Sequence, residues 1–154
     1  MGPSATRLSK ALRANERLAL DTAPFIYYLG DDSRRAPVLV EVIRRVRDRR
    51  LSAMTSVITE AELLVIPMRS RDRARVVQVS ELLSGIPVRE MGRATAYLAA
   101  EIRAEHRLRL PDAIVAASAI EAGCTALLGN DAAFRRIEDR ITYLHLDDLI
   151  DDDE

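Results

Sequence analysis

Four acidic residues lie at or near the boundaries of apolar segments in the sequence, and their carboxylates could take part in catalysis. They are Asp21, Glu62, Asp112 and Asp131. Asp21 and Asp131 close short apolar runs, Glu62 lies in an apolar stretch, and Asp112 follows a proline. Carboxylates that converge in space repel one another, by roughly 4 kcal/mol for a pair about 4 Å apart at an effective dielectric of 20. A hard cation such as Mg²⁺ or Mn²⁺ relieves that repulsion, so the pattern indicates metal-assisted chemistry, of which phosphodiester hydrolysis is a leading example.

Each acid also has a purely structural interpretation. Asp21 or Asp131 could cap the helix that follows it, and Asn130 could cap in place of Asp131. Asp112 could simply interact with a helix dipole. Taken one at a time, these residues leave both interpretations open, and only their joint pattern favours a shared site.

A second question concerns which glutamate belongs with the aspartates. Glu60 and Glu62 are two residues apart, so on a helix they point about 200° apart and cannot both face one ion. One of them is therefore expected to be an ordinary surface residue.

The elements that must position these side chains alternate between short strands and helices. We expect strands at 17–20, 51–55, 86–88, 125–128 and 141–146, and helices from Thr22 and at 37–49, 58–66, 71–83, 95–105 and 111–122. This alternation is typical of an α/β fold with a parallel sheet. Ligands bind beyond the carboxyl ends of the strands in such sheets, where Asp21 and Asp131 would lie.

Several boundaries follow from particular residues. Thr22 is a candidate helix cap with Pro24 in the first turn, Pro67 is expected to end the helix at 58–66, and Pro87 suggests an edge strand. The division predicted is an N-terminal extension at 1–15, one domain at 16–146, and an acidic C-terminal tail at 147–154 that frays.

The composition bounds the class of protein. With 154 residues, 48% hydrophobic and 31% charged, the chain is expected to fold as one globular domain. No apolar run approaches the roughly 18 residues that a membrane span needs. A single cysteine, Cys124, excludes an internal disulfide, and the N-terminus lacks a secretory apolar region, so a cytoplasmic location is expected.

The basic residues are unevenly distributed. The net charge is −1 and Lys10 is the only lysine, so a polyanion would have to be attracted by local arginines. Arginine blocks at 44–50 and 69–75 are expected to be mostly solvated helix faces, although one could follow an RNA backbone. His106 and His145 lack metal-ligand spacing, and Cys124 is expected to belong to the core.

Two other acid-based folds are disfavoured by what is missing. A phosphoacceptor receiver domain needs a lysine beside its phosphate, and Lys10 is far from that position. A haloacid-dehalogenase phosphatase needs a second aspartate two residues after the first, where this chain has Ala23.

The order and spacing of four segments resemble those of the PIN-domain ribonucleases, most closely the toxins of VapBC toxin–antitoxin pairs. The segments are 18–22, 56–63, 110–119 and 127–134, and the likeness spans 17–146. The resemblance implies a three-layer α/β/α fold whose four or five parallel strands follow the order 3-2-1-4-5. It also implies Mg²⁺ or Mn²⁺ as cofactor, RNA as substrate, a homodimer, and a VapB-type antitoxin as partner.

Carried over residue by residue, the resemblance makes Asp21, Glu62, Asp112 and Asp131 both the catalytic residues and the metal ligands. Glu62 is preferred to Glu60 because the family's glutamate stands directly before a leucine. Two departures are Gly129, where the family usually has Ser or Thr, and Ala133, where an acid often stands. They leave open an alternative, a PIN module that binds RNA or a protein partner without catalysis.

Overall fold

Five parallel strands form a single sheet at the centre of the protein. The computed structural model describes residues 6–152. The strand order is β3-β2-β1-β4-β5, which confirms the expected fold. The strands are β1 (Arg17–Leu20), β2 (Ser52–Ser56), β3 (Val88–Arg89), β4 (Ala126–Gly129) and β5 (Thr142–His145).

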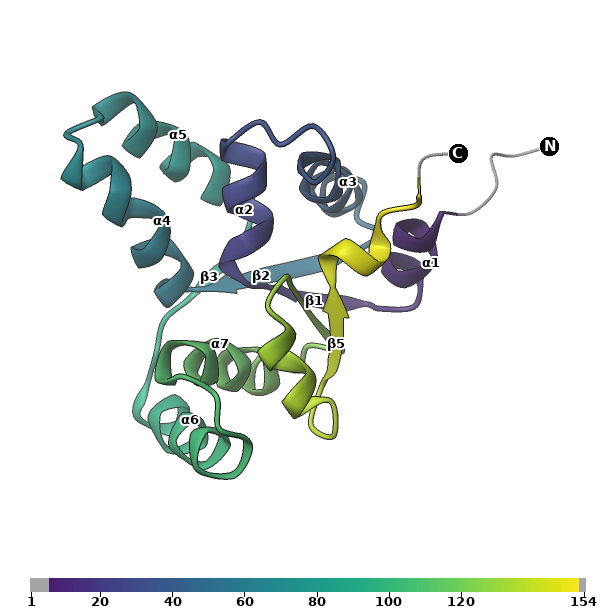
Figure 1. Cartoon of the computed structure of the whole chain (residues 1–154), viewed down its shortest axis with the longest axis vertical. Helices are drawn as coiled ribbons and strands as arrows, with labels where there is room; N and C mark the ends of the chain where they lie inside the picture. The colour runs from purple at the N-terminus through teal and green to yellow at the C-terminus, as the bar shows by residue number, and fades with distance from the viewer. Residues whose placement is uncertain (1–5, 153–154) are drawn as a thin grey trace.

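Helices cover both faces of the sheet (Figure 1). One layer contains α2 (Thr22–Leu29), α3 (Ala36–Arg47), α4 (Val57–Arg69) and α5 (Arg73–Leu83). The other contains α6 (Arg93–His106) and α7 (Leu110–Glu121). The 3₁₀ helix η1 (Ala132–Ile137) precedes β5, while α1 (Arg7–Arg13) and η2 (Leu146–Leu149) pack together beside the sheet.

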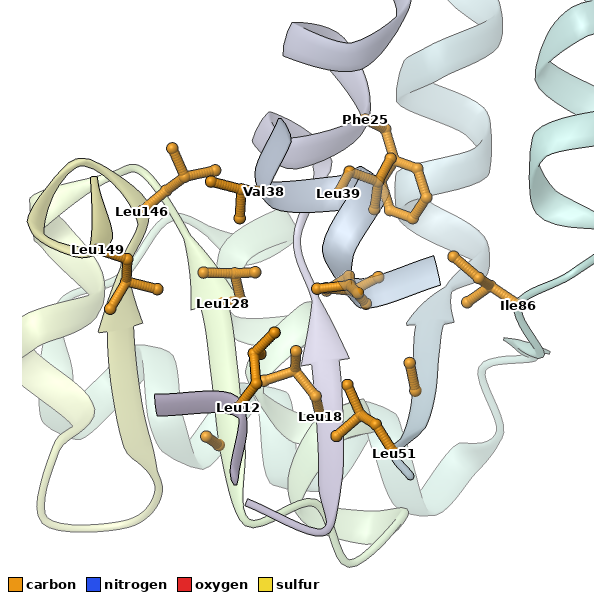
Figure 2. Packing of buried hydrophobic residues seen from close by; sticks show 14 of the residues in the cluster. Leu12, Leu18, Phe25, Val38, Leu39, Leu51, Ile86, Leu128, Leu146 and Leu149 are labelled. Atoms are coloured by element: carbon orange, nitrogen blue, oxygen red, sulfur yellow. The ribbon is translucent and has the colours of Figure 1, made fainter. Parts of the chain in front are cut away.

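The strands are short and apolar because both of their faces are buried, as expected of a parallel sheet covered by helices. On β1, Leu18 and Leu20 belong to one hydrophobic cluster and Ala19 to the other, and Leu128 and Leu127 divide in the same way on β4. Figure 2 shows the first cluster, in which Leu18 and Leu128 lie among side chains from the surrounding helices. Two cores therefore hold β1 and β4 in register and fix the ends at which the acids lie.

Three sequence expectations about helix and strand boundaries need correction. Asp21, not Thr22, occupies the N-cap position of α2. Pro67 does not end α4, which continues to Arg69; the proline removes one backbone hydrogen bond, and its ring is buried. β3 begins after Pro87 and not at residue 86, although its edge position is confirmed.

The expectation that the acidic tail frays is wrong for its described part, residues 147–152. Leu149 is buried in the same cluster as Leu12 of α1, and Asp147 accepts hydrogen bonds from Arg35 at 2.8 and 3.2 Å. Arg7 forms ion pairs with two aspartates of this segment. Apolar contacts and complementary charges therefore tie the two ends of the chain together. Residues 1–5, 153 and 154 lie outside the described part. Within residues 6–152, no helix is long and apolar enough to cross a lipid bilayer.

Candidate active site

The other three acids lie within electrostatic reach of Asp21 at the carboxyl end of the sheet. Asp21 follows β1, and its backbone N–H donates to the carbonyl of Leu128 on neighbouring β4 at 2.9 Å. Asp131 follows β4, Glu62 lies in the second turn of α4, and Asp112 lies in the first turn of α7. The hydroxyls of Thr22 and Thr59 lie 3.2 Å apart and join the starts of α2 and α4, which brings Glu62 toward Asp21.

Asp21 is the most perturbed carboxylate of the site. It is only 8% exposed. Its pKa is raised from the ordinary value of 3.8 to about 7, first by burial and then by the charges of Asp112, Glu62 and Asp131, against the lowering effect of the Thr22 backbone N–H. Although Asp21 occupies an N-cap position, its side chain makes no capping hydrogen bond. The capping interpretation therefore does not account for Asp21.

Asp112 and Glu62 share this electrostatic environment. Asp112 is also 8% exposed; burial raises its pKa, the charge of Asp131 adds to this, and Arg109 opposes it. Glu62 is an exposed residue at the rim, yet partial desolvation of its carboxylate raises its pKa, followed by the charge of Asp112. Mutual effects of this kind require short distances, so Asp21, Glu62 and Asp112 form one electrostatic unit.

Asp131 has a structural role as well as a place beside the site. It is exposed, and its side chain caps η1 by accepting from the backbone N–H of Ala133 at 2.9 Å. The capping interpretation is thus correct for Asp131. Its charge nevertheless raises the pKa values of Asp21 and Asp112, which places it within electrostatic reach of both.

The donor chemistry of the site suits a hard divalent cation. All four side chains offer carboxylate oxygens, which Mg²⁺ and Mn²⁺ prefer. Within residues 6–152, no three His, Cys, Asp or Glu side chains are gathered closely enough to bind one ion without adjustment. Asp21, however, is buried and ionisable, and within residues 6–152 no basic side chain forms an ion pair with it; the backbone N–H of Thr22 is the group that lowers its pKa. A buried carboxylate without a cationic partner is stabilised by a bound cation.

The sequence matches the model of one protein family, the PIN domain, over residues 18–140. The chain belongs to the PIN domain family. No curated protein matches it in sequence.

Several solved structures share this PIN fold at low sequence identity. VapBC2 from Rickettsia felis, bound to a DNA fragment from its promoter, has a TM-score of 0.68 at 15% identity and covers 84% of this chain and 98% of that chain. VapBC-1 from nontypeable Haemophilus influenzae has a TM-score of 0.65 at 17% identity, covering 85% and 98%. VapBC-5 from Mycobacterium tuberculosis has a TM-score of 0.58 at 19% identity, covering 84% and 97%.

Gly129 of this PIN domain stands directly beside Asp21. A Cβ atom at position 129 would lie 3.3 Å from the Cβ of Asp21 and 3.6 Å from the hydroxyl of Tyr143. The absence of a side chain there therefore lets β4 approach Asp21 closely. Ser or Thr at this position would require a small local shift.

Tyr143 and His145 belong to the surroundings of the site, and sequence reasoning missed the role of both. The Tyr143 hydroxyl donates to the backbone carbonyl of Asp131 at 2.8 Å and lies 3.0 Å from Nδ1 of His145. This chain of hydrogen bonds from β5 holds the turn that carries Asp131. The two residues stand at alternate positions of one strand, which could have indicated a shared face.

The arginine block at 44–50 is mostly exposed, as expected, and Arg45 is the exception. Arg45 is buried, and its guanidinium donates to Glu41 at 2.8 Å and to Ser9 at 3.2 Å. Arg44 donates two hydrogen bonds to the same glutamate, at 2.6 and 2.9 Å. Arg44 and Arg45 therefore share the single negative charge of Glu41, and the hydrogen bonds to it already engage both guanidinium groups.

Other features of the chain lie apart from the acids. A hollow of about 680 Å³ between α3 and α5 contains none of the four carboxylates. His106 lies 3.1 Å from a carboxylate oxygen of Asp139, outside the site. Burial raises the pKa of the Cys124 thiol to about 11, which makes it unreactive at neutral pH.

The two glutamates of α4 are expected to differ sharply on substitution. Glu62→Gln should lower the affinity for Mn²⁺ by about 10–100-fold, the range expected when a ligand or its support is lost. Glu60→Gln should leave it unchanged, because only Glu62 is coupled to Asp21 and Asp112. Titration calorimetry with each variant tests this, with the other as its control. If Glu60→Gln loses Mn²⁺ binding and Glu62→Gln binds Mn²⁺ normally, Glu60 and not Glu62 is the ligand.

Proposed function

We propose that this PIN domain protein is a Mg²⁺- or Mn²⁺-dependent endoribonuclease, and that it acts as the toxin of a toxin–antitoxin pair in the cytoplasm. The observation that carries the proposal is the pair of buried carboxylates, Asp21 and Asp112, at the carboxyl end of the sheet, where burial and the charge of Asp112 both oppose the ionisation of Asp21. Such a pair is costly for stability alone, and a site for divalent ions explains it.

Asp21 and Asp112 would hold the ion from the buried side, and Glu62 and Asp131 would complete the ligand set from the exposed rim. Once bound, the ion would activate a water molecule and stabilise the charge that develops on the phosphate in the transition state. Residues 16–146 would carry this chemistry, with the packed terminal segments bracing them.

The proposal is tested by incubating the purified protein with single-stranded RNA and Mg²⁺ or Mn²⁺. Cleavage that a chelator stops, and that the Asp112→Asn variant lacks, is the expected result. Binding of RNA without any cleavage would instead support the alternative, a non-catalytic PIN module. Gly129 and Ala133 favour that alternative, because both lack polar groups that related sites often contain.

The toxin assignment rests on the kind of protein that shares this fold. The similar solved structures include a toxin–antitoxin complex and a member of the VapBC family of toxin–antitoxin systems. We propose that an antitoxin places a basic side chain among the four acids, where it would compete with the ion. A small neighbouring gene that encodes a DNA-binding protein, and whose product abolishes cleavage, would support this.

We further predict a homodimer in which α4 contributes to the interface. This helix exposes Val65, Ile66 and Met68, which are 49%, 70% and 59% exposed, and grouped apolar side chains of this kind mark association surfaces. Multi-angle light scattering at micromolar concentration should show a dimer, and Ile66→Asp should shift it toward monomer. Val40→Asp, at a 50% exposed residue of α3, is the control. A wild-type monomer would contradict the prediction.

A further inference from the structure

Arg109 stands at the mouth of the acidic site, in a position that helix chemistry does not explain. It is the N-cap residue of α7 and makes no capping hydrogen bond, since a guanidinium cannot accept from a backbone N–H. A cation at a helix N-terminus also lies at the unfavourable end of the helix dipole. Its side chain is 76% exposed, so burial does not explain it either.

The one side-chain partner of Arg109 among the described residues is a member of the site. Its Nε donates to Oδ2 of Asp112 at 3.3 Å. The charges of Asp112, Asp131 and Glu62 all raise the pKa of the guanidinium, and Arg109 in turn lowers the pKa values of Asp112 and Glu62. The guanidinium therefore contacts Asp112 and lies within electrostatic reach of Asp131 and Glu62.

Neighbouring arginines of this region are engaged elsewhere. Arg103 donates to the carbonyl of Leu108 at 2.7 Å, and Arg136 donates to the carbonyl of Arg107 at 3.0 Å. Arg140 is held by two glutamates of α6. Arg109 thus differs from them in having an exposed guanidinium that rests on a candidate metal ligand.

This contact is suited to being exchanged. The guanidinium end of the pair is exposed and its hydrogen bond to Asp112 is 3.3 Å long, so Arg109 can leave at small cost once a divalent ion takes its place on the buried carboxylate. When Asp112 binds a divalent ion, its oxygen becomes less available to the guanidinium. A free guanidinium beside a metal site is well matched to a phosphate, because its planar fork donates two parallel hydrogen bonds to two oxygens.

We propose that Arg109 is a substrate-binding residue that holds a backbone phosphate of single-stranded RNA beside the carboxylate site and rests on Asp112 when no RNA is bound. This rests on the proposed ribonuclease function. In the RNA-free protein Arg109 competes with the ion for Asp112, and in the complex it adds one positive contact to the phosphate chain. Its removal should therefore affect metal and RNA in opposite directions.

The experiment compares Arg109→Gln with Arg13→Gln, which removes the same charge from an exposed position at the end of α1, ahead of β1 and away from the carboxyl end of the sheet. Mn²⁺ affinity is measured by titration calorimetry in the otherwise wild-type protein. RNA affinity is measured across monovalent salt in the Asp21→Asn background, which keeps the RNA intact. For Arg109→Gln we expect tighter Mn²⁺ binding, by a few-fold, and weaker RNA binding. The log–log salt slope should fall in magnitude by about 0.7, the value for one phosphate of a single strand.

The remaining outcomes are distinct. Tighter Mn²⁺ binding with an unchanged salt slope would make Arg109 a counter-ion only and overturn the proposal, as would equal behaviour of the two variants. Arg109→Lys should retain the slope, which separates loss of charge from damage to the fold. If the protein with Arg109 intact binds no RNA at all, the ribonuclease function itself fails; if it binds RNA and Arg109→Gln does so equally well, only this inference fails.

Discussion

Asp21→Asn and Asp112→Asn are each expected to abolish metal-dependent RNA cleavage while the fold remains intact. Each substitution replaces a buried carboxylate by a neutral amide of the same shape. The ion therefore loses a negatively charged ligand, and no cavity is left. A loss of about 4 kcal/mol of transition-state stabilisation corresponds to roughly a thousandfold in rate. Both residues are 8% exposed, so water cannot replace the missing ligand easily.

The measurement is the initial rate of cleavage at saturating Mg²⁺, with circular dichroism to confirm folding. Asp31→Asn is a matched control, because Asp31 is exposed at the far end of α2 and has a positive φ of 53°, which asparagine also tolerates. Cleavage at the wild-type rate by Asp112→Asn would refute the assignment of the site.

The second large effect concerns stability in the absence of metal. The pKa of Asp21 is about 7 in the folded protein and ordinarily 3.8, so between these values the folded state binds more protons than the unfolded state. The free energy of unfolding should therefore fall as pH rises from about 4 to about 7. A shift of this size corresponds to a few kcal/mol, on the order of 4 at most. Asp21→Asn should remove this decline and be the more stable protein at pH 8.

Denaturant titrations at pH 5, 6, 7 and 8 in the presence of a chelator measure this directly. The informative quantity is the difference in the free energy of unfolding between wild type and Asp21→Asn at each pH. Carboxylates elsewhere with lowered pKa values act in the opposite direction, but they contribute equally to both proteins and cancel in this difference. Adding Mn²⁺ at pH 8 should restore the wild type, by about 2.7 kcal/mol at a free concentration 100 times the dissociation constant. Parallel stability profiles for the two proteins would contradict the burial of an ionisable Asp21.

The secondary structure follows closely from local patterns. Runs such as 18–20 and 126–129 are short, apolar and directly followed by polar residues, which is how strands buried on both faces end. The resemblance to the PIN family supplied the strand order, which local patterns do not contain. The local patterns also placed Asp21, Asp112 and Asp131 at strand and helix ends, because the ends of apolar runs are visible in the sequence itself.

Local patterns misjudged residues whose surroundings come from distant parts of the chain. Pro67 lies inside α4, Arg45 is buried against Glu41 and Ser9, and the acidic segment at 147–152 packs on α1 and α3. Each outcome depends on a partner that pattern reading does not identify. Two further interactions also could not be identified from local patterns. They are the hydrogen bond from Tyr143 to the carbonyl of Asp131 and the effect of the acidic charges on Arg109.

The amino-acid sequence by itself determined which side chains could form the site and which elements carry them. The tertiary structure decided how those side chains differ. Asp21 and Asp112 are buried, whereas Glu62 and Asp131 are exposed, and Asp131 also caps a helix. The physical reason is that secondary structure depends on neighbours along the chain, whereas desolvation and the coupling of charges depend on what packs around each group in space.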